Sequence, residues 1–154
     1  MKTLAKKDIE WVAGRLSTDY LRIMQTHRSD DGLVSRKCFH ANELAGLHVM
    51  LIRLSPGQTY PAHLHEDVDE FYLVLSGSMR IQSHDIGGTN MQDVLLCDDR
   101  DLAGGTMGLL MPRNTWHATT AGDNGVVFLE VRPGPFVKGN TRYCDSMNLS
   151  HGSR

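Results

Sequence analysis

A long succession of short apolar runs, each followed by turn-forming residues, most strongly constrains the fold of this chain. The runs are rich in β-branched and large apolar residues and lie near residues 34–40, 47–54, 58–63, 69–75, 78–84, 106–111, 115–120 and 126–132. Glycine, proline, asparagine and aspartate separate them, and these residues favour turns through their backbone angles or side-chain hydrogen bonds. Many short strands joined by turns predict an all-β protein built as an antiparallel sandwich or barrel.

The segment before this region has a different pattern. Between residues 5 and 26, apolar residues recur at spacings of three and four, which predicts an α-helix that packs on the outside of the core. Ser17 and Asp19 could form an N-cap that divides the segment into two short helices. We therefore expect an N-terminal helical segment over residues 1–30, a barrel over 31–143 and a polar, loose tail over 144–154.

Bulk properties exclude several classes of function. The 154 residues suit one domain, and a net charge of −2 gives no basic surface for nucleic acid or for a membrane. No apolar run is long enough to span a bilayer, and residues 1–16 lack the apolar stretch of a secretory signal, so we expect a cytoplasmic protein. Cys38, Cys97 and Cys144 are odd in number and widely spaced, which favours reduced thiols.

His63 and His65 raise the question of a metal site. Residues two apart on a strand point to one face with Cα atoms roughly 7 Å apart, so the two imidazoles could share an ion. Glu70 would be out of phase with them on one continuous strand, but the intervening residues 66–69 have turn chemistry. A reversal there would bring Glu70 back beside His65 on the next strand.

The other acidic residues of this stretch have two possible places. Glu66, Asp67 and Asp69 are expected in the turn, where they face water. Asp67 or Asp69 could instead be a metal ligand.

His117 is a fourth candidate ligand. Pro112 and Asn114 set a turn before it, because asparagine tolerates the left-handed conformation. By itself His117 would be a surface or structural histidine, but together with the other three candidates we expect it to bind metal. Three imidazoles and one carboxylate suit one divalent transition metal ion, either Fe, Mn, Ni or Zn, with Co and Cu also compatible, and ligand type alone does not select among them.

The stretch from Gly57 to Gly77 resembles the first cupin motif along its whole length. The spacing is carried by Gly57, His63, His65, Glu70 and Gly77. The resemblance implies an antiparallel double-stranded β-helix, a jelly-roll barrel, with the metal ligands His63, His65, Glu70 and His117.

The second cupin motif is recognisable in Pro112, Asn114 and His117, although it departs from the family pattern. Asn114 stands where the family usually has glycine, and Ala121 stands where it usually has asparagine. The two motifs are further apart than in minimal cupins, so we expect residues 85–105 to form a projecting loop.

A narrower resemblance links residues 33–140 to the small WbuC-type cupin metalloproteins. It rests on the segments 35–65 and 116–136. Members of that family occur with genes for surface-polysaccharide sugars, so the resemblance implies a sugar-related context but defines no reaction. Cupins are commonly dimers, and we expect a homodimer.

Side chains in phase with the ligands should line the barrel interior. They are Pro61, Tyr72, Val74, Thr115 and Thr119. The opposite face of the strand after the turn is apolar too, and the N-terminal helix or a dimer partner must cover it. Its side chains are Phe71, Leu73 and Leu75.

Glu130 and Tyr72 are the candidate catalytic residues. Glu130 interrupts an apolar strand, where it either pairs with an arginine or points into the cavity as a general base or as a partner of a ligand. Tyr72 is either a proton donor or a core filler. Arg53 could meet an anionic substrate or lie on a solvated face, and His40 and His48 are expected to be structural or exposed.

Three functions fit these residues. The first is a metal-dependent enzyme that acts on a small sugar or sugar-derived metabolite by isomerase, epimerase or lyase chemistry, with the ion as Lewis acid and Glu130 or Tyr72 moving protons. The second is an Fe(II)-dependent dioxygenase. The third is a non-catalytic cupin that binds a metal or a sugar.

Overall fold

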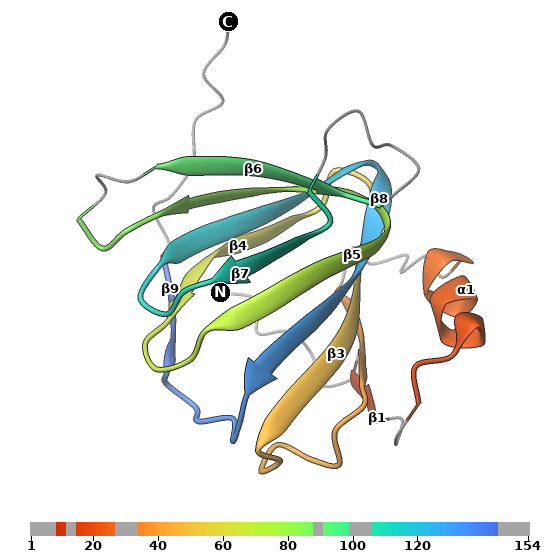
Figure 1. The fold of residues 1–154 in the computed structure, drawn as a ribbon, viewed down its shortest axis with the longest axis horizontal. Helices are drawn as coiled ribbons and strands as arrows, with labels where there is room; N and C mark the ends of the chain where they lie inside the picture. The colour runs from red at the N-terminus through yellow and green to blue at the C-terminus, as the bar shows by residue number, and fades with distance from the viewer. Residues whose placement is uncertain (1–8, 12–14, 27–33, 88–90, 99–105, 145–154) are drawn as a thin grey trace, which may run out of the picture.

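The computed structural model describes residues 9–11, 15–26, 34–87, 91–98 and 106–144, and these form a barrel of antiparallel strands with one helix outside it (Figure 1). The elements are β1 (Ile9–Trp11), α1 (Thr18–Thr26), β2 (Ser35–Cys38), β3 (Leu47–Leu54), β4 (Thr59–His65), β5 (Glu70–His84), β6 (Gln92–Cys97), β7 (Gly108–Met111), β8 (Trp116–Pro133) and β9 (Thr141–Tyr143). The expected all-β class is therefore confirmed.

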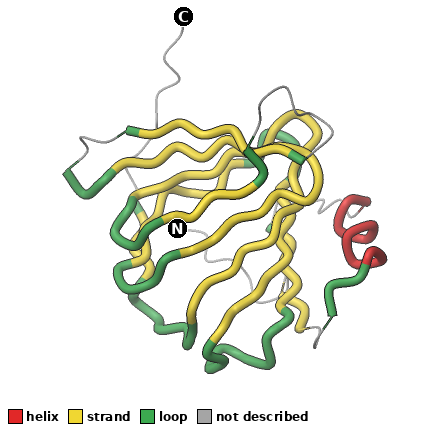
Figure 2. Tube along the Cα trace, viewed as in Figure 1, coloured by secondary structure: helices red, strands yellow, loops and turns green. Residues whose placement is uncertain are grey.

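The two long strands β5 and β8 connect both layers of the barrel. They pair with each other from Phe71–Val131 to His84–Trp116. The first half of β5 also pairs with β7, and the second half of β8 with β3, which makes one layer. The second half of β5 pairs with β6, and the first half of β8 with β4, which makes the other (Figure 2). This arrangement is the expected jelly roll.

Both long strands bend where two glycines with left-handed backbone meet. Gly77 has φ 79° and Gly125 has φ 76°, and the β5–β8 register shifts on either side of Gly77. Residues 69–75 and 78–84 are therefore one bent strand instead of two, as are residues 115–120 and 126–132. A glycine bulge turns a strand while the pairing continues on both sides of it.

Two hydrophobic clusters lie on the two faces of the β3–β8 layer. The larger fills the barrel interior and includes Ile52, Val74, Ile81 and Phe128. The smaller lies outside, where Met24 of α1 packs on Leu51 and Val127 beside the partly buried Leu75. The helix therefore covers part of the apolar outer surface, as expected.

The N-terminal segment is only partly helical. The Oγ of Ser17 accepts the N–H of Tyr20 at 3.3 Å, so the expected cap exists and α1 begins beside it. Before the cap, Ile9–Trp11 form a strand that pairs in parallel with β2, and the prediction of helix there is wrong. The backbone groups at the edge of β2 form hydrogen bonds with this segment. The spacing of apolar residues, on which the helix prediction rested, does not show such partners. Residues 1–8, 12–14 and 27–33 lie outside the described part.

One further segment differs from expectation. Gln92–Cys97 form β6 along β5, so the region 85–105 is not simply a projecting loop, although residues 88–90 and 99–105 lie outside the described part. Thr141–Tyr143, at the end of the expected barrel, form β9 along β4, and the N–H of Cys144 donates to the carbonyl of Ala62. Residues 145–154 lie outside the described part. No helix among the described residues is long and apolar enough to cross a membrane.

Candidate metal centre

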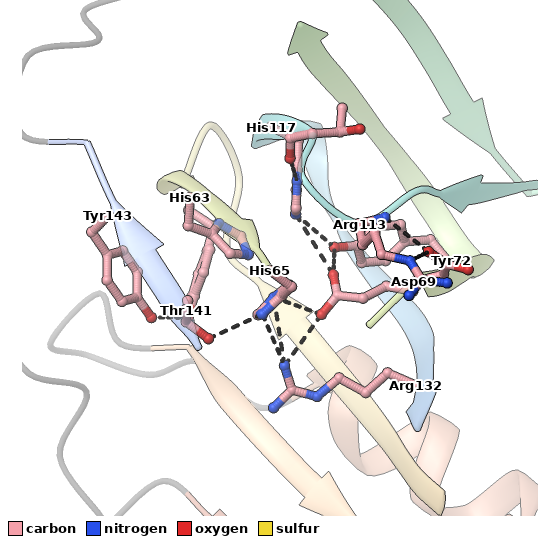
Figure 3. A network of polar contacts seen from close by, with 12 residues as sticks. His63, His65, Asp69, Tyr72, Arg113, His117, Arg132, Thr141 and Tyr143 are labelled. Carbon is pink, nitrogen blue, oxygen red and sulfur yellow. Dashed lines mark hydrogen bonds and ion pairs between the residues drawn. The ribbon is translucent and has the colours of Figure 1, made fainter. Parts of the chain in front are cut away.

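Four side chains from three strands converge inside the barrel. His63 and His65 come from β4, Glu70 begins β5, and His117 lies near the start of β8 (Figure 3). One nitrogen or oxygen from each lies within 4.8 Å of those of the others, and all four side chains are buried. The structure thus brings together all four residues predicted as ligands.

Strand pairing and two turns create this convergence. His63 faces His117 directly across β4 and β8. The chain reverses after His65, which places Glu70 beside it. Asn114 takes φ 58° in the turn before β8, and its N–H donates to the carbonyl of His65 at 2.7 Å, so the expected asparagine turn is confirmed.

The acidic side chains of the reversal are held away from the group. Glu66 pairs with Arg142 at 3.1 Å, and Asp67 accepts a hydrogen bond from Asn140. Asp69 accepts the backbone N–H of Arg113 at 2.9 Å. These contacts support the turn assignment over the alternative that Asp67 or Asp69 is a ligand.

Each imidazole has its Nδ1 occupied, which leaves its Nε2 for a metal. The Nδ1 of His63 lies 2.9 Å from the carbonyl of Pro61, and the Nδ1 of His117 lies 2.9 Å from that of Thr115. A carbonyl only accepts, so both rings donate from Nδ1, and it is Nε2 that is left to offer a lone pair to a metal. The Nδ1 of His65 lies 3.0 Å from the Oγ1 of Thr141. Such partners are the usual support of a metal-binding histidine, so the donor set fits a divalent ion.

Glu70 is the most heavily contacted member of the group. The Tyr72 hydroxyl donates to its Oε2 at 2.5 Å, the Nε2 of His65 lies 2.7 Å from its Oε1, and an Arg132 nitrogen lies 3.3 Å from the same oxygen. Burial alone would raise the pKa of Glu70, but its interactions with His117 and His65 outweigh burial and hold that pKa well below its usual range. The carboxyl group is therefore ionised, as a ligand must be.

His63 is neutral for a different reason. Burial, followed by the nearby His117, lowers the pKa of His63 to about 3. Metal binding requires an unprotonated nitrogen, so this ring needs no deprotonation at neutral pH.

Tyr72 and Glu130, the candidate catalytic residues, face each other across β5 and β8. Tyr72 is buried, and its hydroxyl also lies 3.1 Å from the Nε2 of His117. Burial and the charge of Glu70 raise the pKa of Tyr72 well above 10. Glu130 is half-buried; burial and Glu70 raise its pKa, while the charges of Arg36 and Arg132 oppose that rise.

The predicted lining is right in part. Tyr72, Val74 and Thr119 are buried, but Pro61 is exposed. The β4–β8 register shifts between Tyr60 and His63, so period-two counting from His63 gives the wrong face before the shift. Tyr60 packs against the interior cluster instead.

Arg53, His40 and His48, which were also considered in the sequence, lie outside the candidate metal group. Arg53 alternates with the interior residues Ile52 and Leu54, so its phase is outward, away from the site. His40 and His48 are buried and stack with ring centroids 4.1 Å apart. Of the two places expected for them, structural or exposed, they take the structural one.

Three residues that contact the group were not predicted. They are Arg132, Thr141 and Tyr143. The Tyr143 ring stacks on His63 with centroids 5.8 Å apart. Arg132 shares phase with Glu130 on β8, and this spacing could have indicated its place beside the site. Thr141 and Tyr143 lie on β9, which is too short and polar to be recognised as a strand from its sequence.

Comparison with known proteins supports the fold. No protein-family model and no curated protein matches the chain. It is similar in structure to CapF, a capsular polysaccharide assembling protein from Staphylococcus aureus, with TM-score 0.62 and 21% identity over 75% of this chain and 31% of that chain. It is also similar to oxalate decarboxylase from Bacillus subtilis, with TM-score 0.50 and 26% identity over 64% of this chain and 24% of that one.

A pumpkin pro-11S globulin is a third similar structure, with TM-score 0.58 and 16% identity over 76% of this chain and 29% of that chain. The chain spans less than a third of the length of each of these proteins. It therefore has the fold of the cupin proteins, and its buried group of three histidines and one glutamate supports a divalent metal inside that fold.

Proposed function

We propose that the chain is a metal-dependent enzyme that acts on a small sugar or sugar-derived metabolite. The convergence of His63, His65, Glu70 and His117 with every imidazole Nδ1 occupied carries this proposal. A divalent ion held by these residues supplies a Lewis acid that polarises a carbonyl or hydroxyl oxygen. The fold likeness to CapF and the resemblance to WbuC-type cupins support a polysaccharide-sugar context.

Glu130 is the residue that we assign to proton transfer. Its raised pKa brings the carboxyl closer to neutral pH, where one group can both accept and release a proton. It is half-buried. Its place opposite Tyr72 puts it on the interior face that carries Glu70.

Tyr72 has a different role from the one that its phase alone suggests. Its hydroxyl donates to Glu70, and its raised pKa keeps it protonated, so it holds the carboxylate of Glu70 in place. We assign it as a positioning residue for that ligand, while Glu130 acts on the substrate.

Deuterium exchange tests this function. Isomerases, epimerases and lyases of this kind remove a proton from the carbon next to a carbonyl, so incubation of keto sugars in D₂O should introduce deuterium at that carbon, seen by NMR. We expect exchange with the metal-loaded protein and none with Glu130→Gln, which should keep its metal. Loaded protein that exchanges no sugar in the panel would contradict the proposal: oxygen uptake instead would indicate a dioxygenase, and sugar binding without exchange a binding protein.

A further inference from the structure

The barrel interior beside the metal group has a surplus of positive charge. Arg36 and Arg132 both interact electrostatically with Glu130 inside the barrel. With a divalent ion in place, two guanidinium groups and that ion would face two carboxylates from the described residues, Glu70 and Glu130. The surplus persists even when Glu130 is ionised, and the raised pKa of Glu130 enlarges it.

Arg132 is already occupied. One of its nitrogens lies 3.3 Å from Glu70, and its guanidinium stands over the Phe136 ring at 5.5 Å. Its charge is therefore committed to Glu70 at the metal group.

Arg36 is held in place but not saturated. It lies on β2 two residues before Cys38, which belongs to the interior cluster, and it pairs across to Ile52, which belongs to the same cluster. Its guanidinium donates a hydrogen bond to the hydroxyl of Tyr60. Within the described part of the chain, its buried Nε has no hydrogen-bond partner. A buried donor without an acceptor costs free energy unless a ligand or water supplies one.

Tyr60 connects this guanidinium to the metal group. Its ring centroid lies 5.1 Å from that of His63. Arg36 and Glu130 are both half-buried. Tyr60 thus contacts Arg36 through its hydroxyl and His63 through its ring, so about one aromatic ring separates the guanidinium from the metal group, a span that one sugar ring would cover.

We propose that Arg36 binds an oxyanion group, a carboxylate or a phosphate, on a substrate whose other end lies at the metal group. This inference rests on the proposed function and adds the charge class of its substrate. The planar guanidinium fork matches the geometry of either oxyanion. Arg36 would act as a specificity residue, and Tyr60 would hold its side chain.

Three sugars of matched size test this proposal, namely glucose, glucuronate and glucose 6-phosphate, with saturation-transfer NMR on Zn(II)-loaded protein. We expect at least one anionic sugar to bind about tenfold more tightly than glucose, as for a hydrogen bond between charged groups. Preference for glucuronate identifies a carboxylate, and preference for glucose 6-phosphate a phosphate. Equal affinity for all three, or no detectable binding of either anion, would overturn the proposal.

Variants test whether a preference for anionic sugars depends on Arg36. Arg36→Gln should remove it, Arg36→Lys should retain part of it, and the exposed Arg80→Gln is the matched control that should leave it unchanged. The same preference in Arg36→Gln would overturn the assignment, and Arg36→Lys provides the second test if the glutamine variant does not fold.

Metal content separates this inference from the proposed function. If the protein holds metal but shows no anion preference, only the inference about Arg36 is wrong. If the chain holds no metal yet shows a preference that depends on Arg36, the anion site stands and the proposed function is wrong.

Discussion

The hydroxyl oxygen of Thr141 lies 3.0 Å from Nδ1 of His65, so the short strand β9 supports a ligand of the candidate metal group from a point 76 residues further along the chain. Backbone pairing of His65 with Thr141 fixes this contact. The side chains of residues 140 and 142 add hydrogen bonds to the turn after His65. The last described strand is therefore part of the site.

Thr141→Val should weaken metal binding. Valine keeps the shape but removes the hydroxyl that hydrogen-bonds Nδ1 of His65, so we expect metal affinity to fall about 10–100-fold, as is usual for partners of metal-binding histidines. Competition with a chromophoric chelator measures this affinity. Thr141→Ser keeps the hydroxyl and should remain near wild type; equal affinities for the valine and serine variants would contradict the role of Thr141.

The metal-free protein should lose stability as the pH falls below about 6.5. The folded chain keeps His63 neutral down to a pH of about 3, whereas the unfolded chain protonates it near 6.5. The unfolded state thus binds more protons in this window, so unfolding becomes easier as the pH falls. The lowered pKa of Glu70 acts in the same direction below its ordinary value of 4.5.

His63→Gln isolates the histidine contribution to this pH dependence. Its free energy of unfolding should fall less between pH 7 and pH 5 than that of the wild type, by about 2 kcal/mol, as expected for one suppressed protonation. Urea unfolding of chelator-treated protein at each pH measures the difference. His40 and His48, whose pKa values burial also lowers, remain in both proteins and cancel from the comparison. Parallel pH profiles would show that His63 is not held neutral.

Glu70→Gln should destabilise even the metal-free protein, because it leaves the guanidinium of Arg132 without its partner. Both side chains are largely buried, at 2% and 12% exposure, so we expect a loss of about 3 kcal/mol. Glu66→Gln is the matched control, since its partner Arg142 is exposed and the change should cost less than about 1 kcal/mol. Urea unfolding compares the two variants, and similar losses would mean that Glu70 does not hold this charge.

Gly77→Ala tests the bend that joins the two layers of the barrel. A Cβ there would lie 2.2 Å from the carbonyl oxygen of Gly125, in addition to the strain of a positive φ. Gly57→Ala carries similar strain at φ 68° but meets no atom within 4 Å. We expect Gly77→Ala to lose about 2–3 kcal/mol more stability than Gly57→Ala. Equal losses in thermal or urea unfolding would show that the close approach at Gly77 is relaxed at little cost.

Sequence patterns predicted the barrel and the candidate ligands because both depend on local signals. The phase of His63 and His65, the turn chemistry of residues 66–69 and the asparagine before His117 were each sufficient to place a side chain. Strand boundaries were less predictable. A glycine such as Gly77 or Gly125 can mark either a turn between two strands or a bend within one strand. Only the pairing with the neighbouring strand distinguishes the two cases.

The surroundings of the site depend on contacts that no local pattern contains. The register shift after Tyr60 reverses which residues face inward, so Pro61 was predicted to line the cavity and Tyr60 was missed. Arg36 and Lys37 are neighbouring basic residues in a short polar strand. Nothing in that segment shows which of the two side chains points into the barrel. Thr141 reaches His65 only because β9 pairs with β4.

The metal content of the purified protein tests the central claim most directly. We predict about one divalent transition metal ion per chain by elemental analysis, from a donor set of this type. His63→Ala combined with His117→Ala should abolish it, whereas His40→Ala combined with His48→Ala, at the stacked pair outside the group, should leave it unchanged. Metal content that survives the loss of both His63 and His117 would contradict the assignment of this group as the metal centre.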